Sequence, residues 1–415
     1  MLTKLLRYAL TRSFKGFEFR DGAEAPDLQA LELPGLYVHI PFCRSLCSFC
    51  PYCKELYHSQ RAERYLECLL QEIRLAGAGL TEKKKASSLY FGGGTPALMV
   101  EAMPPILAEL RAVFDITGGI GAELHPTDIT RDTLQRLKVA GVTMVSLGIQ
   151  TFDRGCLEKL GRPWEPFADK VRLVHDHGFS VIDVDLIFAL PGQTADALAE
   201  DVRTAFASGA TQVSTYPFID FSFATNQYRP QGGKAKLRML DALMAAAEEQ
   251  GFERTSVWTL ARPGSEKYSS VTRDPFIGFG LSAASLTKDQ FRINTFSLEG
   301  YCARLENGFL PTALTLDFTE RQRAAYHLFW SAYGLTIDPE QFQAVMGRPL
   351  KELYGRELAL AEGLGILEKK DEGWHLTDRG ARLYHSVEQA YTGAYIDRMW
   401  DTLRRTPFPK TLLLK

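Results

Sequence analysis

Four of the chain's seven cysteines lie close together, in a short loop that follows an apolar strand. Cys43, Cys47 and Cys50 have the spacing C-x-x-x-C-x-x-C, and Cys53 comes three residues later. Because the loop is too short to bury itself as an ordinary core, these thiols indicate a soft-metal site. Three thiolates suit a [4Fe–4S] cluster with one iron left open to bind a small molecule. The alternatives are a structural zinc site, which more often joins two distant C-x-x-C pairs, and disulfides.

The stretch YVHIPFCRSLCSFC, Tyr37 to Cys50, resembles the radical S-adenosylmethionine (SAM) superfamily. Within that superfamily it is similar to the oxygen-independent coproporphyrinogen III oxidases and the related haem chaperones. The resemblance implies that Cys43, Cys47 and Cys50 bind a [4Fe–4S] cluster. Cys53 stands one residue farther along than the oxidases' extra cysteine, which is not a ligand, and we expect it to be a bystander.

The resemblance also implies the cofactors and partners. One or two SAM molecules bind with the cluster, and a flavodoxin- or ferredoxin-like reductant supplies an electron. The resulting 5′-deoxyadenosyl radical abstracts a hydrogen atom from a small-molecule substrate, in this family a tetrapyrrole. The protein's own part is to position the reactants and to exclude water.

Two short segments match the part of the family's SAM pocket that lies nearest the cluster. Phe49 matches an aromatic residue that lies against the adenine, although simple loop packing would also explain it. Gly92, Gly93, Gly94 and Thr95 match the family's GGGTP motif, which holds the amino group of SAM. Three glycines allow a ligand to approach the backbone closely.

Polar residues at later strand ends match the rest of that pocket, although each alone could be an ordinary strand end. The resemblance implies that Glu123 and Arg162 meet the amino-acid end of SAM, where an arginine fork suits a carboxylate. It implies that Gln150 and Asp185 reach the ribose hydroxyls. Tyr37 matches a tyrosine near a second SAM in the oxidase and is the candidate catalytic residue.

An alternation of strands and helices must position these residues. We predict strands at 35–40, 88–91, 120–124, 143–149, 181–188 and 212–217, with helices near 60–76, 97–114, 131–140, 166–177 and 195–208. This order predicts right-handed βαβ units and a parallel sheet. The predicted fold class is α/β, a partial (β/α)6 radical SAM barrel with its chemistry at the C-terminal strand ends.

Later segments predict three further regions around that barrel. The expected division is an N-terminal amphipathic segment (1–34), the barrel (35–220), a sheet extension and substrate-side region (221–316) and a C-terminal winged-helix-like α+β domain (317–415). The last domain is predicted from helices near 320–332, 339–345 and 351–362, a hairpin at 366–377 with its turn at 371–373, and a helix over 378–404. Winged helices often bind DNA, but the family carries a similar domain, and we expect no nucleic-acid partner.

Composition sets the class and the compartment. The chain has 415 residues, 45% hydrophobic and 24% charged, with a net charge of −2, which is typical of a soluble globular protein. We find no apolar run long enough to span a membrane, and with free cysteines this predicts a cytoplasmic location. The N-terminus, MLTKLLRYALTRSFKGF, has a basic amphipathic helical pattern. It predicts either peripheral membrane contact or a helix packed on the main domain.

Three functions remain open at this point. The first is a radical SAM enzyme that acts on a tetrapyrrole, as the coproporphyrinogen oxidases do. The second is a methyltransferase that uses two SAM molecules on an aromatic or quinone-like substrate. The observation that supports this second function is Thr259-Leu260, which stand where the family has Asn-Phe. The third is a haem chaperone with little catalysis. The resemblance to the oxidase family outweighs two altered pocket residues and favours the first.

Overall fold

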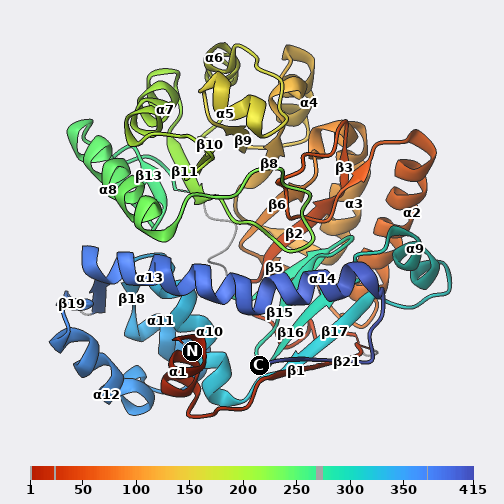
Figure 1. The fold of residues 1–415 in the computed structure, drawn as a ribbon. Helices are drawn as coiled ribbons and strands as arrows, with labels where there is room; N and C mark the ends of the chain where they lie inside the picture. The colour runs from red at the N-terminus through yellow and green to blue at the C-terminus, as the bar shows by residue number, and fades with distance from the viewer. Residues whose placement is uncertain (1, 23–24, 268–273, 372) are drawn as a thin grey trace.

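Six parallel strands form the centre of the computed structural model, which describes residues 2–22, 25–267, 274–371 and 373–415 (Figure 1). They are neighbours in the order β11-β10-β9-β8-β6-β2, as a partial (β/α) barrel requires. Their bounds are β2 (Gly35–Ile40), β6 (Ser88–Gly93), β8 (Ile120–Leu124), β9 (Met144–Gln150), β10 (Val181–Phe188) and β11 (Gln212–Pro217). The predicted α/β class and partial barrel are therefore confirmed.

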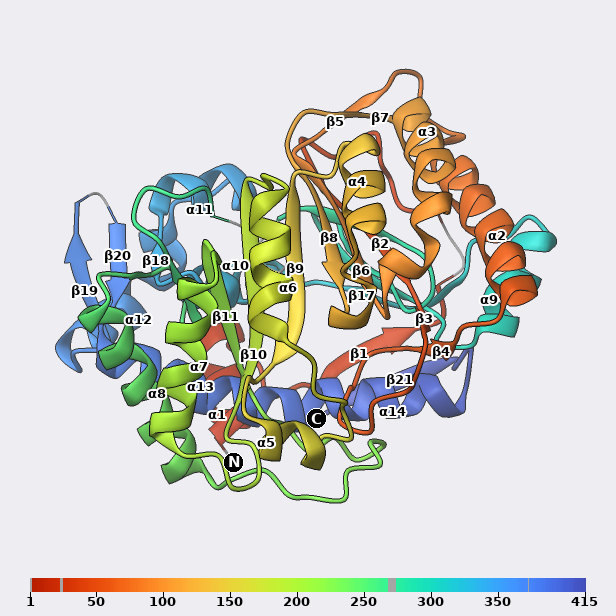
Figure 2. The ribbon, with the colours of Figure 1, turned by 90° about the horizontal axis from the view of Figure 1, so that it is seen from above.

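Helices cover the outer face of these strands, as Figure 2 shows from above. Side-chain caps begin two of them: Thr130 caps α4 and Thr194 caps α7. A further short helix, α5, was not predicted, although Asp153 caps it by accepting from the backbone N–H of Cys156 at 2.7 Å. The helices are α2 (Ser59–Gly77), α3 (Met103–Val113), α4 (Arg131–Val139), α5 (Arg154–Lys159), α6 (Phe167–Asp176), α7 (Ala195–Ala207) and α8 (Gly233–Glu249).

The sheet extends beyond the barrel to fourteen strands. The sequence predicted an extension within residues 221–316, but not that β1 and β21 would join its edge. Next to β11 it adds β13 (Thr259–Ala261) and β12 (Glu253–Arg254); β14 (Phe276–Phe279) is parallel to β2. The sheet continues through β15 (Ala284–Leu286), β16 (Gln290–Asn294), β17 (Thr312–Asp317), β1 (Phe17–Arg20) and β21 (Thr411–Leu414). Between β16 and β17 the chain forms helix α9 (Leu298–Glu306), which packs on α2. Both ends of the chain thus pair at one edge, and the domain boundary expected at 316/317 falls inside β17.

The C-terminal region has the order of a winged helix. Helix α10 (Glu320–Tyr333), strand β18 (Thr336–Ile337), α11 (Pro339–Met346) and α12 (Leu350–Gly363) precede the hairpin β19 (Leu367–Lys370) and β20 (Gly373–Leu376). The three strands form a small sheet in the order β18-β20-β19. The predicted hairpin turn includes Glu372, which lies outside the described residues.

A long helical segment then crosses the molecule between the barrel and the remaining elements (Figure 1). It consists of α13 (Asp378–Tyr391), a π-helical turn (Thr392–Ile396) and α14 (Asp397–Arg405). The sequence predicted a helix over nearly the same range, 378–404. The segment brings Arg404 of α14 against the loop of cysteines that follows β2.

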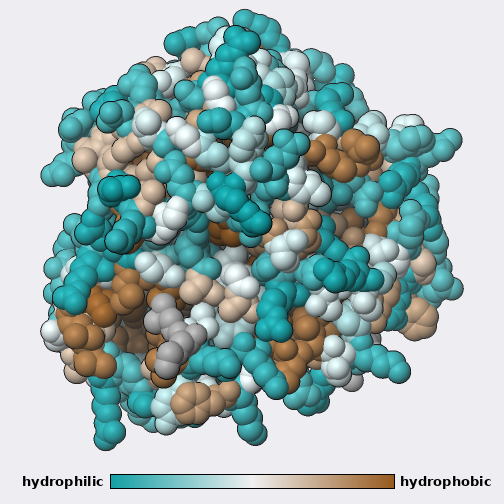
Figure 3. All heavy atoms as spheres, viewed as in Figure 1, coloured by the Kyte–Doolittle hydropathy of each residue, from teal (hydrophilic) through white to brown (hydrophobic). Residues whose placement is uncertain are grey.

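The N-terminal helix α1 (Leu2–Thr11) packs against α10 and α13. Buried Arg7 donates to the Tyr395 hydroxyl at 3.0 Å, and the Tyr354 hydroxyl donates to the Leu10 carbonyl at 2.9 Å. Of the two alternatives, the structure thus shows the packed helix. Leu5 and Tyr8 remain exposed, and apolar side chains gather at the lower left of Figure 3, where α1 and α12 lie. Peripheral membrane contact stays a prediction; among the described residues, we find no helix long and apolar enough to cross a bilayer.

Candidate active site

The cysteine loop leaves the C-terminal end of β2 and is closed at its base. The short strands β3 (Phe42–Cys43) and β4 (Glu55–Leu56) pair in parallel there, and the Tyr57 N–H donates to the Cys43 carbonyl at 2.9 Å. The same base is tied to the end of β6, because the Gly94 N–H donates to Ile40 at 2.7 Å and the Thr95 N–H donates to Phe42 at 2.8 Å. The loop is therefore a fixed element at the C-terminal edge of the parallel strands, where this fold places chemistry.

The cysteines fall into two environments. All seven are free thiols, so the disulfide alternative is wrong. Cys43, Cys47 and Cys50 are half-buried, whereas Cys53 is only 3% exposed and its Sγ donates to the Phe296 carbonyl at 3.4 Å. Burial raises the pKa of Cys53 to about 12, which opposes formation of its thiolate. The bystander role of Cys53 stays a prediction, and its burial away from the other three thiols is the observation that supports it.

The first cysteine has a neighbour suited to a thiolate. The Thr95 hydroxyl lies 3.9 Å from the Cys43 sulfur as a donor. Burial raises the pKa of the Cys43 thiol to about 11, and the Thr95 hydrogen bond opposes that rise. Throughout the described part of the chain, no three His, Cys, Asp or Glu side chains converge as a group that could hold a metal ion. Three half-buried thiols on one loop remain the donor set that a [4Fe–4S] cluster with one open iron takes.

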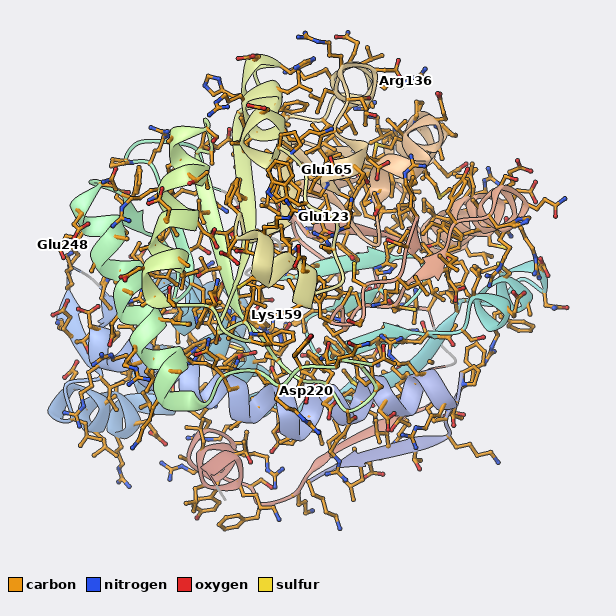
Figure 4. The ribbon with its side chains drawn as sticks, turned by 45° about the horizontal axis from the view of Figure 1, so that its top comes forward. Glu123, Arg136, Lys159, Glu165, Asp220 and Glu248 are labelled. Atoms are coloured by element: carbon orange, nitrogen blue, oxygen red, sulfur yellow. The ribbon has the colours of Figure 1, made fainter. Side chains whose placement is uncertain are left out.

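The glycine run forms a cradle that side chains would fill. A Cβ on Gly92 would lie 2.9 Å from both the Glu123 carboxylate and the Tyr37 ring, and one on Gly94 would lie 2.7 Å from backbone atoms of Pro41 and Phe42. The Gly93 N–H donates to Glu123 Oε2 at 3.0 Å. Tyr37, the glycines and Glu123 are thus brought together, and Glu123 lies near the middle of the molecule in Figure 4.

Glu123 is held by the backbone yet poorly solvated. Burial raises the pKa of Glu123 to about 7, and hydrogen bonds from the Gly93 N–H and from Tyr90 oppose that rise. A carboxylate in this position would gain from a cationic partner, because an opposite charge restores the ionised form that burial penalises. The ammonium group of SAM is such a partner, so the residue fits its expected role.

Arg162 presents an unused donor. Its Nη1 donates to the Gly148 carbonyl, its guanidinium lies 5.8 Å from the centroid of the Phe49 ring, and its Nε is buried with no partner among the described residues. A buried donor left unpaired is costly, so a carboxylate ligand would satisfy it. Phe49 itself is 8% exposed and packs with Cys156 and neighbouring apolar residues, so its loop-packing explanation also holds.

Asp185 and Gln150 come from adjacent strands. The Ser146 hydroxyl donates to Asp185 Oδ2. Burial raises the pKa of Asp185 well above its ordinary value, and the charge of Asp183 raises it further. Gln150 pairs with Leu186 in the β9–β10 register and has a φ of 75°, a conformation rare for a residue with a side chain. Backbone strain of this kind is concentrated at functional sites.

Several site residues escaped the sequence prediction. His39 bridges the Tyr37 hydroxyl and the Cys53 carbonyl, both at 2.9 Å, and burial lowers the pKa of His39 to about 4, which favours the neutral ring. Its position two residues after Tyr37, on the same strand face, could have revealed it. Arg44 pairs with buried Asp128 at 2.7 Å and ties the loop to the end of β8, which no sequence signal shows.

Comparisons with known proteins agree with this site. Residues 37–205 match the radical SAM superfamily model, and residues 335–383 match the HemN C-terminal domain. The chain therefore contains a radical SAM domain over residues 37–205, and its cofactors are a [4Fe–4S] cluster and SAM.

Within that class, the chain is similar to haem chaperones and oxygen-independent coproporphyrinogen III oxidases. It is 26% identical to the heme chaperone HemW of Bacillus subtilis over 86% of this chain and 98% of the relative. It is 27% identical to the oxygen-independent coproporphyrinogen III oxidase of Pseudomonas aeruginosa over 91% and 88%. The solved coproporphyrinogen III oxidase HemN of Escherichia coli shares the fold, with a TM-score of 0.76, 23% identity and coverage of 93% and 98%.

Proposed function

We propose that the protein is a radical SAM oxidoreductase of the coproporphyrinogen oxidase type that acts on a tetrapyrrole. The observation that carries the proposal is the joint placement of the cysteine loop, the glycine cradle and Glu123 at one end of the parallel strands. Oxidases with a similar sequence over most of the chain support the tetrapyrrole class. A flavodoxin- or ferredoxin-like reductant would supply the electron.

We assign the cluster and the amino-acid end of SAM to separate groups of residues. Cys43, Cys47 and Cys50 would hold the cluster, which together with SAM supplies a 5′-deoxyadenosyl radical for hydrogen abstraction. The glycine cradle and Glu123 would receive the ammonium group of SAM, and Arg162 its carboxylate.

Three further residues would complete the pocket. Gln150 and Asp185 would reach the ribose, and the Phe49 ring would flank the adenine. Tyr37, held by His39 at 2.9 Å, would face the substrate or a second SAM. This hydrogen bond orients the phenol before a ligand arrives.

The methyltransferase alternative loses one of its arguments. Thr259 and Leu260 were expected to line a changed substrate pocket, but Leu260 is fully buried in the main core. The Thr259 hydroxyl accepts from Ser256 Oγ at 2.8 Å and is 7% exposed. The two residues therefore do not indicate a different substrate, and the relatives described above add no support for methyl transfer.

The test is product analysis under anaerobic conditions. Reconstituted protein, SAM, dithionite and coproporphyrinogen III should give 5′-deoxyadenosine together with carbon dioxide and a decarboxylated porphyrinogen. The Cys43→Ala variant serves as the control without a cluster. Formation of S-adenosylhomocysteine would instead indicate methyl transfer. No turnover of coproporphyrinogen III, despite SAM cleavage, would refute the oxidase proposal.

A second candidate is a haem chaperone, because HemW proteins of two bacteria match over 86% of this chain and 96–98% of their own length. The discriminating measurement is a haem titration followed by absorbance. Stoichiometric haem binding without consumption of SAM would favour the chaperone. Turnover of coproporphyrinogen without stable haem binding would favour the oxidase.

A further inference from the structure

Two cationic side chains donate hydrogen bonds to backbone carbonyls of the cysteine loop. Lys54 Nζ donates to the carbonyl oxygens of Cys47 and Cys50, the latter at 2.7 Å. Arg404 Nη2, from α14 at the other end of the chain, donates to the Pro51 carbonyl at 2.5 Å. Backbone carbonyls between the second and fourth cysteines thus accept hydrogen bonds from two positively charged side chains.

Contacts outside the cysteine loop also hold the Arg404 side chain in place. Its guanidinium lies 4.4 Å from the centroid of the Phe223 ring and 5.2 Å from that of Phe296, which are cation–π distances. Helix α14 is itself anchored, because Asp397 accepts from the Ser222 N–H at 2.9 Å and Trp400 stacks on Phe221 with centroids 5.9 Å apart. Such preorganisation indicates a defined position for the charge rather than a free surface arginine.

Within the described ranges of the chain, neither cation has a carboxylate at ion-pair distance. Among the ion pairs of the described residues, Arg44 on the same loop pairs with Asp128, whereas Lys54 and Arg404 have no acidic partner within 4.0 Å. Arg404 Nε is buried and has no hydrogen-bond partner in the described part of the chain. Placing half-buried charges beside carbonyls alone is unfavourable unless an anion lies nearby.

A [4Fe–4S] cluster bound by three thiolates is such an anion, and it becomes more negative when it is reduced. We propose that Lys54 and Arg404 are positioning residues for this cluster: they fix the cysteine loop through its carbonyls, and their charges stabilise the reduced cluster more than the oxidised one. The proposal rests on the cluster assigned above. It extends the site to α14, which lies outside both matched family segments.

The size of the effect follows from Coulomb's law. At about 10 Å and an effective dielectric constant of about 20, one unit charge changes an equilibrium by roughly tenfold. Neutralising either residue should therefore lower the ratio of reduced to oxidised cluster, at a fixed potential, by roughly tenfold. The oxidised cluster should still assemble in Lys54→Gln.

The experiment is a redox titration of the full chain, reconstituted anaerobically and followed by electron paramagnetic resonance. Lys54→Gln, Arg404→Gln and Arg404→Lys are compared with wild type, and iron and sulfide are measured in each. Arg405→Gln is the matched control, because Arg405 is the exposed neighbour of Arg404 and pairs with Asp401. We expect a lower midpoint potential in both glutamine variants, and near wild-type potentials in Arg404→Lys and Arg405→Gln.

The possible outcomes separate this proposal from the cluster assignment. Wild-type midpoint potentials in both glutamine variants, with full cluster content, would overturn the proposal. If Arg404→Gln loses its cluster, restoration by Arg404→Lys supports the role of charge, and loss in both would show that Arg404 only supports the loop. A wild-type protein that takes up no cluster would refute the assignment itself.

Discussion

Arg162 offers the sharpest test of the SAM site, because its structure shows what a ligand would complete. Its Nε is buried without a partner in the described residues, while Nη1 is already used by the Gly148 carbonyl. We expect Arg162→Ala to weaken SAM binding by removing a charge-assisted hydrogen bond to the ligand's carboxylate. Because the Arg162 guanidinium also lies 5.8 Å from the Phe49 ring of the cysteine loop, the iron content of the variant must be measured with its SAM affinity.

The magnitude follows from the kind of bond lost. A hydrogen bond to a charged group contributes about 1.5–3 kcal/mol. Since about 1.4 kcal/mol is a factor of ten in affinity, the Kd for SAM should rise about 10- to 150-fold. Arg162→Lys keeps the charge but loses the planar fork, so we expect a smaller rise.

The assay is anaerobic equilibrium dialysis of SAM against protein with a measured iron content. Arg154→Ala is the matched control, because Arg154 lies on α5 nearby and is an exposed partner of Glu158. Thermal unfolding of the apo-protein checks that Arg162→Ala still folds. If this variant, folded and with full iron content, binds SAM as tightly as wild type does, Arg162 does not meet the ligand and its assignment is wrong.

Three further predictions concern the loop and the core. Alanine in place of Cys43, Cys47 or Cys50 should abolish iron binding, whereas Cys53→Ala should retain it, as iron and sulfide analysis will show; the reverse pattern would overturn the ligand assignment. Gly94→Ala should lower cluster content, because the new Cβ would lie 2.7 Å from backbone atoms of Pro41 and Phe42, whereas Gly79→Ala, with open space around it, should not. Burial raises the pKa of Glu72 from 4.5 to about 7, so its contribution to the free energy of unfolding is largest below pH 4.5 and is lost as the pH rises to about 7. Between these two pH values, the free energy of unfolding of the apo-protein, measured with urea, should fall by about 3 kcal/mol less in Glu72→Gln than in wild type. If the variant shows the same pH dependence as wild type, Glu72 is not the group responsible.

The sequence predicted the barrel because its strands and helices carry local signals. Apolar runs such as 181–188, followed by capped amphipathic helices, need no distant partner to be recognised. The edge of the sheet has no such signal. Strand β1 is four residues long, and its pairing with β21 joins the two ends of the chain. A strand this short is fixed by its neighbours rather than by its own pattern.

The candidate site divides in the same way. Cys43 and Gly92 lie in motifs with fixed spacing, and the polar strand ends were assigned because their order and spacing match the SAM pocket of the family that the chain resembles. The SAM contacts assigned to these residues stay predictions. Lys54 directly follows Cys53, so the sequence shows that it lies near the cysteines. Its hydrogen bond to the Cys50 carbonyl depends on the folded form of the loop, which the sequence does not show. Arg404 lies 353 residues from Pro51, and no local pattern announces a contact over that distance.

The contacts of the loop also show that the matched superfamily segment is not the whole site. Residues 37–205 include the cysteines, yet the Cys53 thiol donates to Phe296 and the Pro51 carbonyl accepts from Arg404. Both partners lie beyond that segment, and Arg404 reaches the loop only because α13 and α14 cross the molecule beside the barrel (Figure 1). The observed form of the loop therefore includes contacts from α14 and from Phe296. The same helix contacts the segment after β11, because Asp397 accepts from the Ser222 N–H and hydroxyl, so α14 connects that segment with the cysteine loop.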